Sequence, residues 1–187
     1  MHTPFVRFAL VLGALWLAAP AQAQSSACPA TLNHTLLRLQ DEKPQSLCQY
    51  SGKVILAVNT ASYCGFTGQY KGLEALHARY KAEGLVVLGF PSNDFAQEKG
   101  SNREIAEFCE NTFGVQFPMF AASSVKGAQA NPFFKQLQSL GAPAPKWNFY
   151  KYLIGRDGRL VDSYGSMTGP DNKGLVQAIE RSLKAQP

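Results

Sequence analysis

Two nearly continuous apolar segments with one amphipathic helix between them constrain the fold of this chain most. Lys53–Asn59 reads KVILAVN and Leu85–Phe90 reads LVVLGF, as expected for strands that are buried on both faces of a sheet. Between them, Thr67–Lys81 carries apolar side chains at spacings of three and four, and Gly84 follows as a C-cap. A strand, a helix and a strand in this order form a βαβ unit, so we expect the two strands to be parallel.

The rest of the chain predicts more helices and a hairpin. Ser101 and Glu104 form a capping box at the start of one helix, and Asn131 precedes Pro132 at the start of another. The pair Asp157-Gly158 indicates a hairpin turn. The expected elements are helices at 101–113, 131–140 and 175–184 and strands at 151–154 and 159–163. This order predicts an α/β fold with a mixed central sheet flanked by helices.

The first residues have the pattern of an export signal. Arg7 precedes the apolar run Phe8–Ala19, and the small-residue site Ala21-Gln22-Ala23 follows, which together are typical of a secretory signal peptide. The run is too short to span a membrane, which takes about 20 apolar residues. We therefore expect residues 1–23 to be a signal peptide and residues 24–187 to be one exported domain, located in the periplasm.

The chain has four cysteines, and an exported protein can keep disulfides. A bridge between Cys28 and Cys48 would be structural; the alternative is two unpaired thiols. Cys28 also raises the alternative of a lipid attachment site, which the polar Ser25 disfavours. The spacing of these two cysteines with Cys64 and Cys109 does not match a zinc site, so we expect no metal.

The charge of the chain argues against nucleic acid as a partner. Lys and Arg number 18 against 13 Asp and Glu, for a net charge of +5. No stretch approaches the basic cluster of about five to eight residues that indicates nucleic-acid binding. Beyond the N-terminal run, no segment is long and apolar enough to predict a membrane span.

Cys64 is the strongest candidate for a reactive residue. It follows the first buried strand and precedes the helix expected near Thr67, where the carboxyl ends of strands form ligand sites in α/β sheets. Unpaired N–H groups at a helix N-terminus favour a thiolate. The alternative is a buried structural cysteine. The segment Cys64-Gly65-Phe66-Thr67 lacks a second cysteine, which disfavours a simple dithiol oxidoreductase.

Four motifs in order resemble those of the glutathione peroxidases. They are VNTASYCG at 58–65, LGFPSN at 88–93, FPMF at 117–120 and WNF at 147–149. The resemblance covers about residues 50–185. It implies a thioredoxin-like fold and an enzyme that reduces hydrogen peroxide or organic hydroperoxides with a thiol co-substrate and no other cofactor.

The resemblance also implies roles for individual residues. Cys64 corresponds to the peroxidatic cysteine, which peroxide converts to a sulfenic acid. Gln97, Trp147 and Asn148 correspond to its partners, and each offers an N–H donor. Cys109 is a candidate resolving cysteine, with a buried structural cysteine as the alternative.

Two questions about the reaction stay open at this point. The reductant is either glutathione or a thioredoxin-like protein. The alternative function is an exported thioredoxin-like thiol–disulfide oxidoreductase, which would need a second cysteine near Cys64 in the folded chain.

The chain departs from the family pattern in four places. Ser92 stands where many members have a cysteine, Asp94 stands where Gln is usual, and the loop Phe95–Gln97 is one residue shorter than is common. The insertion that some oligomeric members carry between Phe134 and Trp147 is missing. We therefore expect a monomer.

Overall fold

The computed structural model describes residues 28–186, so the predicted signal peptide at 1–23 lies outside the described residues. A four-stranded sheet in the order β4-β3-β5-β6 forms its centre. The strands are β3 (Val54–Thr60), β4 (Leu85–Pro91), β5 (Lys151–Ile154) and β6 (Leu160–Tyr164). β3 pairs parallel with β4 and antiparallel with β5. The predicted parallel pair and mixed sheet are therefore confirmed.

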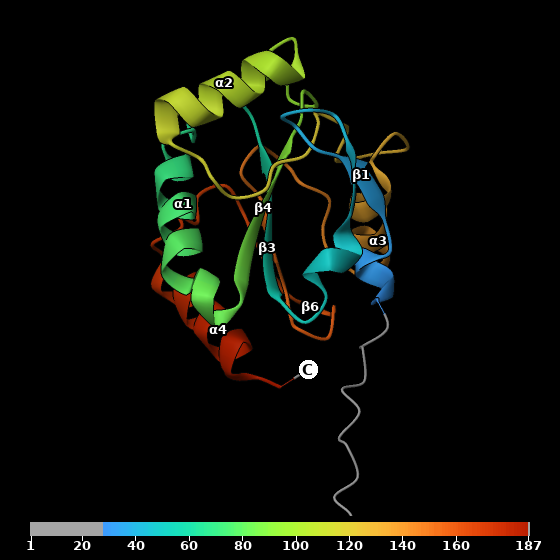
Figure 1. The fold of residues 1–187 in the computed structure, drawn as a ribbon, viewed down its shortest axis with the longest axis vertical. Helices are drawn as coiled ribbons and strands as arrows, with labels where there is room; N and C mark the ends of the chain where they lie inside the picture. Colours follow the sequence, from blue (N-terminus) through green and yellow to red (C-terminus); the bar gives the residue numbers. More distant parts are fainter. Residues whose placement is uncertain (1–27, 187) are drawn as a thin grey trace, which may run out of the picture.

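Helices cover both faces of the sheet (Figure 1). The four α-helices among residues 28–186 are α1 (Gln69–Tyr80), α2 (Asn102–Phe113), α3 (Pro132–Ser139) and α4 (Lys173–Lys184). α1 and α4 lie on one face and α3 lies on the other, while α2 crosses the end of the sheet at which β3 leads into α1 (Figure 1). This end of the molecule carries the segment 61–68 between β3 and α1, which contains Cys64 and is called the cysteine loop below.

Alternation along β3 divides the core into two layers. Val54, Leu56 and Val58 pack with buried side chains of α1, α2 and α4. Ile55 and Ala57 point the other way and pack with the phenylalanines of α3. All seven residues of β3 are buried, which explains why its first five residues are apolar and do not alternate.

The structure contains elements that the sequence pattern does not predict. A small hairpin of β1 (Thr35–Leu37) and β2 (Pro44–Ser46) precedes the main sheet. Three 3₁₀ segments are also present: η1 (Ala30–Leu32), η2 (Leu47–Tyr50) and η3 (Lys81–Glu83). α1 begins at Gln69 and not near Thr67, because Thr67 N–H bonds back to the carbonyl of Cys64 in a turn, at 3.1 Å. No helix among residues 28–186 has the length and apolar character needed to cross a membrane.

Cys28 and Cys48 form a disulfide, as predicted, with their Cα atoms 5.3 Å apart. Cys48 lies in η2, which leads into the amino end of β3, whereas Cys64 follows the carboxyl end of that strand. The disulfide therefore fastens the start of the domain at the end of the sheet opposite to Cys64.

Candidate active site

Cys64 lies in the turn between β3 and α1. Its side chain is only 4% exposed and forms no disulfide. The backbone N–H of Phe66 donates to Cys64 Sγ at 3.5 Å. The turn thus aims a backbone donor at the sulfur next to the N-terminus of α1.

Asn59, at the end of β3, orients the segment 147–150 beside the cysteine loop. Its side-chain Nδ2 donates to the carbonyl of Trp147 at 3.1 Å, and its Oδ1 accepts from Tyr150 N–H at 2.9 Å. Its carbonyl also accepts from Phe149 N–H at 2.7 Å. The amide of Asn59 is fully buried, so these bonds both satisfy it and fix the loop.

Gln97 and Asn148, two of the residues that the resemblance implies, lie together. Asn148 Nδ2 donates to Gln97 Oε1 at 2.9 Å. The Asn148 carbonyl accepts from the hydroxyl of Ser166 at 2.6 Å, which holds the backbone of this residue. The carbonyl of Gln97 accepts from Tyr63 N–H at 2.9 Å. The backbone of the residue before Cys64 is therefore bonded to the backbone of Gln97, a member of this amide pair.

The backbone is strained on both sides of the amide pair. Ala96 has φ of 56° and Phe149 has φ of 61°, a region that residues other than glycine rarely adopt. Ala96 closes a tight turn in which its N–H bonds to the carbonyl of Asn93 at 2.9 Å. This turn is how the shortened loop still places Gln97 next to Asn148. Such strain is typical of functional sites.

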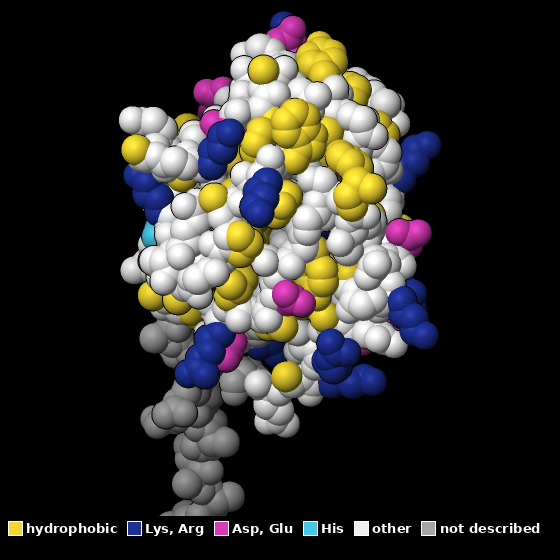
Figure 2. Space-filling view, turned by 180° about the vertical axis from the view of Figure 1, so that it is seen from behind, with side chains coloured by type: hydrophobic (Ala, Val, Ile, Leu, Met, Phe, Trp, Pro, Cys, Tyr) yellow, Lys and Arg dark blue, Asp and Glu magenta, His cyan; other side chains and the backbone are white. Residues whose placement is uncertain are grey.

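Trp147 is a surface residue and not a core anchor. It is 41% exposed, and its ring packs on Phe95 with 5.2 Å between the centroids. Among the hydrogen bonds of residues 28–186, none joins its indole N–H to the sulfur of Cys64. Tyr63 is 65% exposed beside the same loop. Figure 2 shows hydrophobic side chains gathered near the upper end of the rear face, with Lys or Arg side chains among them.

Cys109 is the second free cysteine. It lies on the inner face of α2, is 2% exposed and belongs to the same apolar cluster as Cys64. Burial raises the pKa of its thiol to about 11. At neutral pH it is therefore a protonated and inaccessible thiol as long as α2 stays closed.

Two buried charged residues near the site were missing from the sequence analysis. The Glu98 carboxylate accepts from Ser62 N–H at 3.0 Å, and burial raises the pKa of this carboxyl. Lys151 Nζ donates to Gln69 Oε1 and to the carbonyl of Thr168, and burial lowers the pKa of this ammonium to about 8. Glu98 directly follows Gln97, a residue that the resemblance implies, whereas Lys151 stands in an apolar strand that gives no signal.

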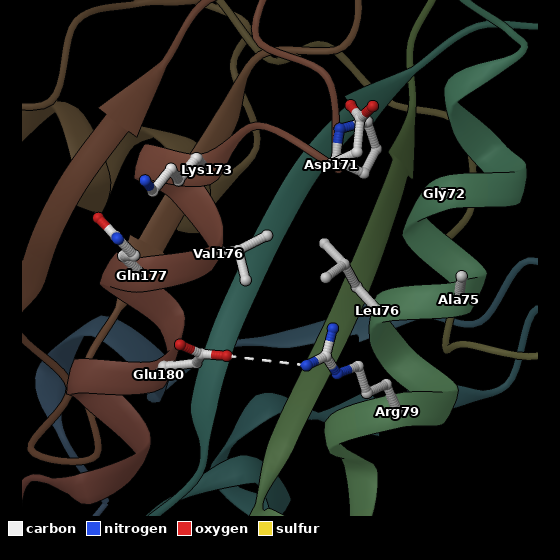
Figure 3. Close-up of a pocket in the computed structure, with 10 residues that line it drawn as sticks. Gly72, Ala75, Leu76, Arg79, Asp171, Lys173, Val176, Gln177 and Glu180 are labelled. Atoms are coloured by element: carbon white, nitrogen blue, oxygen red, sulfur yellow. Dashed lines mark ion pairs between the residues drawn. The ribbon is translucent and has the colours of Figure 1, made fainter.

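The described residues form no metal cluster, and the groove between α1 and α4 lies away from the cysteine site. No group of three or more His, Cys, Asp or Glu side chains there could hold a metal ion. A groove between α1 and α4 is floored by Leu76 and Val176 and crossed by the ion pair Arg79–Glu180 at 3.9 Å (Figure 3). The residues implied by the resemblance do not line this groove.

Comparison with known proteins agrees with this geometry. The family model for glutathione peroxidase matches residues 32–138. The chain is 46% identical over 149 residues to the glutathione peroxidase-like peroxiredoxin gpx1 of Schizosaccharomyces pombe, an alignment that covers 77% of this chain and 93% of that protein. It is 47% identical over 154 residues to the hydroperoxy fatty acid reductase gpx1 of Synechocystis, covering 76% of this chain and 90% of the relative.

A solved structure gives the same result for the fold. The crystal structure of Trgpx in its apo form superimposes with a TM-score of 0.67 at 35% sequence identity. It covers 83% of this chain and 97% of that chain. The predicted thioredoxin-like arrangement of a mixed sheet flanked by helices is therefore confirmed.

Proposed function

This chain belongs to the glutathione peroxidase family, whose reaction is a thiol-dependent reduction of hydroperoxides, and we propose that Cys64 is the residue that reacts with the peroxide. One observation carries the assignment. The backbone N–H of Tyr63, the residue before Cys64, bonds to the backbone carbonyl of Gln97, and the side chain of Gln97 bonds to that of Asn148, so the backbone next to a free cysteine is tied to the segment that carries the amide pair.

The first step is attack of the Cys64 thiolate on the terminal oxygen of the hydroperoxide. The sulfur–oxygen bond forms while the O–O bond breaks, which leaves a Cys64 sulfenic acid and an alkoxide or hydroxide. That oxygen takes up one proton and leaves as alcohol or water. The N–H donors of Gln97, Trp147 and Asn148 stabilise the charge that develops on this oxygen.

The second step uses Cys109. Its thiol loses a proton and attacks the sulfur of the Cys64 sulfenic acid, and the hydroxide that leaves takes up that proton to form water. The product is a Cys64–Cys109 disulfide, which a thioredoxin-like dithiol protein then reduces. Cys109 is buried on α2, so this helix must open in part, because a disulfide requires Cα atoms within about 7 Å.

Organic hydroperoxides with an apolar chain are the substrates that the surface favours. Trp147 and Tyr63 expose aromatic surface next to the cysteine loop, and one relative is named a hydroperoxy fatty acid reductase. Hydrogen peroxide is a second substrate, because the proposed chemistry needs only the O–O bond.

The same proposal includes export and a monomeric state. The basic start, the apolar run and the small-residue site before Gln24 support a signal peptide and a periplasmic location. The missing insertion after Phe134 supports a monomer. N-terminal sequencing of exported protein tests the cleavage site, and light scattering of the mature chain tests the monomer.

Mass spectrometry after one equivalent of hydroperoxide tests the cycle. Wild type should form a Cys64–Cys109 disulfide, Cys109→Ser should stop at the Cys64 sulfenic acid, and Cys64→Ser should stay unmodified. If glutathione reduces the peroxide-oxidised Cys109→Ser protein as fast as it reduces peroxide-oxidised wild type, Cys109 has no role in the cycle. A protein that reduces protein disulfides but not hydroperoxides would favour the oxidoreductase alternative.

A further inference from the structure

We propose that Glu98 is a positioning residue that fastens the Cys64 loop to the segment leading into α2, and that this attachment must open before Cys109 can reach Cys64. The proposal rests on the proposed peroxidase cycle. In it, Glu98 takes no part in the chemistry itself. It favours the reaction of Cys64 with peroxide while it holds the loop, and it delays formation of the Cys64–Cys109 disulfide until it releases the loop.

The carboxylate of Glu98 joins two segments that are distant in the sequence. Its Oε1 accepts from the backbone N–H of Ser62 at 3.0 Å and from that of Lys99 at 2.8 Å. The N–H of Glu98 donates to Asn93 Oδ1 at 3.1 Å, so the loop that carries the carboxylate is itself fixed. Two backbone donors therefore depend on one buried oxygen.

The neighbours of Glu98 extend this attachment to α2. Lys99 Nζ is 3.0 Å from the hydroxyl of Tyr63, and it lies 4.6 Å from the centroid of that ring. The same ammonium lies 5.2 Å from the ring centroid of Phe108, the residue before Cys109. Segment 97–99 thus holds the residues that precede both cysteines.

The carboxylate is buried with incomplete compensation. Glu98 is 9% exposed, and its second oxygen, Oε2, has no hydrogen-bond partner among the described residues. Burial raises the pKa of this carboxyl, and hydrogen bonds from Ser62 and Lys99 together with the Lys99 charge lower it only in part. The carboxylate charge in turn raises the pKa of the nearby Tyr70 and Cys109. A buried network that is only partly satisfied is costly to keep, so this attachment is suited to open.

The attachment has opposite consequences for the two steps. While it is closed, it fixes the turn that presents Cys64 to the peroxide. In the same state it keeps α2 closed over Cys109, whose thiol is buried and protonated. Loosening the attachment should therefore slow the first step and speed the second, which a purely structural defect would not do.

The test compares Glu98→Ala and Glu98→Gln with wild type, and with Glu110→Ala as a control on the exposed face of α2. Rapid mixing with hydrogen peroxide, acid quench and mass spectrometry give the rate of sulfenic acid formation at Cys64 and the rate of its conversion to the disulfide. Glu98→Ala should slow the first by roughly tenfold, the effect of a lost hydrogen bond to a charged group. It should speed the second by roughly threefold, because the local opening costs less.

Glu98→Gln should stay within about twofold of wild type in both steps, because its amide oxygen accepts the same two N–H groups. Glu110→Ala should also stay within about twofold, because the side chain of Glu110 is exposed. Equal slowing of both steps by Glu98→Ala, or no change in either, would overturn the proposal. A wild-type protein that forms the sulfenic acid but never the disulfide would instead refute the role of Cys109.

Hydrogen exchange in the wild type supplies a measurement that does not depend on the folding of any variant. Exchange at the amides of Ser62 and Tyr63 should increase when peroxide converts the protein to the disulfide form. Unchanged protection of these two amides in that form would also overturn the proposal.

Discussion

Changing Cys64 to serine isolates the chemistry of Cys109. Cys28 and Cys48 are bridged, so Cys109 becomes the one free thiol among the three cysteines that remain. Burial raises its pKa from 9.0 to about 11. Well below both values, a difference of two pKa units makes the thiolate fraction of the folded protein about 100-fold smaller than that of the unfolded protein.

The assay is alkylation of Cys64→Ser by iodoacetamide, followed by mass spectrometry between pH 7 and 11, in native buffer and in concentrated urea. Only the thiolate is alkylated, so the native rate at pH 8 should be about 100-fold lower than the rate in urea. The native titration should have its midpoint near pH 11. Equal rates and equal midpoints in the two solvents would refute the burial of Cys109 behind a closed α2.

The same pKa difference predicts a stability change with a defined sign. Between pH 9 and 11 the folded state holds the Cys109 proton and the unfolded state releases it. The stability that this difference contributes is therefore present below pH 9 and is lost as pH rises to 11, by about 3 kcal/mol. Replacing Cys109 with serine should remove this part of the pH dependence.

Three further predictions concern residues around the site and the disulfide. Burial lowers the pKa of Lys151 from 10.5 to about 8, so the unfolded state holds this proton more strongly and the contribution of Lys151 to stability should rise by about 3 kcal/mol between those pH values. This rise opposes the loss that comes from Cys109, so the stability of Lys151→Met in urea unfolding should fall below the wild-type curve more steeply as pH rises over this range. Trp147→Phe should slow hydroperoxide reduction about tenfold or more, because it removes one N–H donor. Its melting temperature should change by only a few degrees, because the side chain is 41% exposed, and a large fall in melting temperature with unchanged activity would contradict this role. Replacing Cys28 and Cys48 together with serine should lower the free energy of unfolding by about 3 kcal/mol and leave the peroxide rate of the folded protein unchanged, as calorimetry and stopped-flow kinetics would show.

The central elements of the fold could be predicted because their signals are local. β3 and β4 are buried on both faces and therefore consist almost entirely of apolar residues. The Ser101 cap of α2 is observed, with its hydroxyl accepting from Glu104 N–H at 3.3 Å. The order of these elements was sufficient for the parallel pair at the centre of the sheet.

The elements that sequence analysis missed depend on contacts between distant segments. β1 and β2 have only three residues each, too few for a pattern to show. Glu98 matters because it bonds Ser62, 36 positions away in the sequence, and Lys151 is stabilised by Gln69 from another element. Such partners follow from the tertiary fold and leave no periodic signal.

The candidate site shows the same division. Gln97 and Asn148 could be placed together from the motifs, and the structure joins them by one hydrogen bond. The position of the Trp147 ring against Phe95 depends on how the loop around Ala96 turns, which the motifs do not specify.

A single-turnover measurement of hydroperoxide consumption tests the assignment of Cys64 most directly. Reduced wild type and Cys109→Ser, mixed with excess hydroperoxide and no reductant, should each consume one equivalent per chain in a fast phase. Cys64→Ser should show no fast phase, although it keeps Cys109 and the amide pair. A fast phase of wild-type size and rate in folded Cys64→Ser would contradict the assignment of Cys64 as the peroxidatic residue.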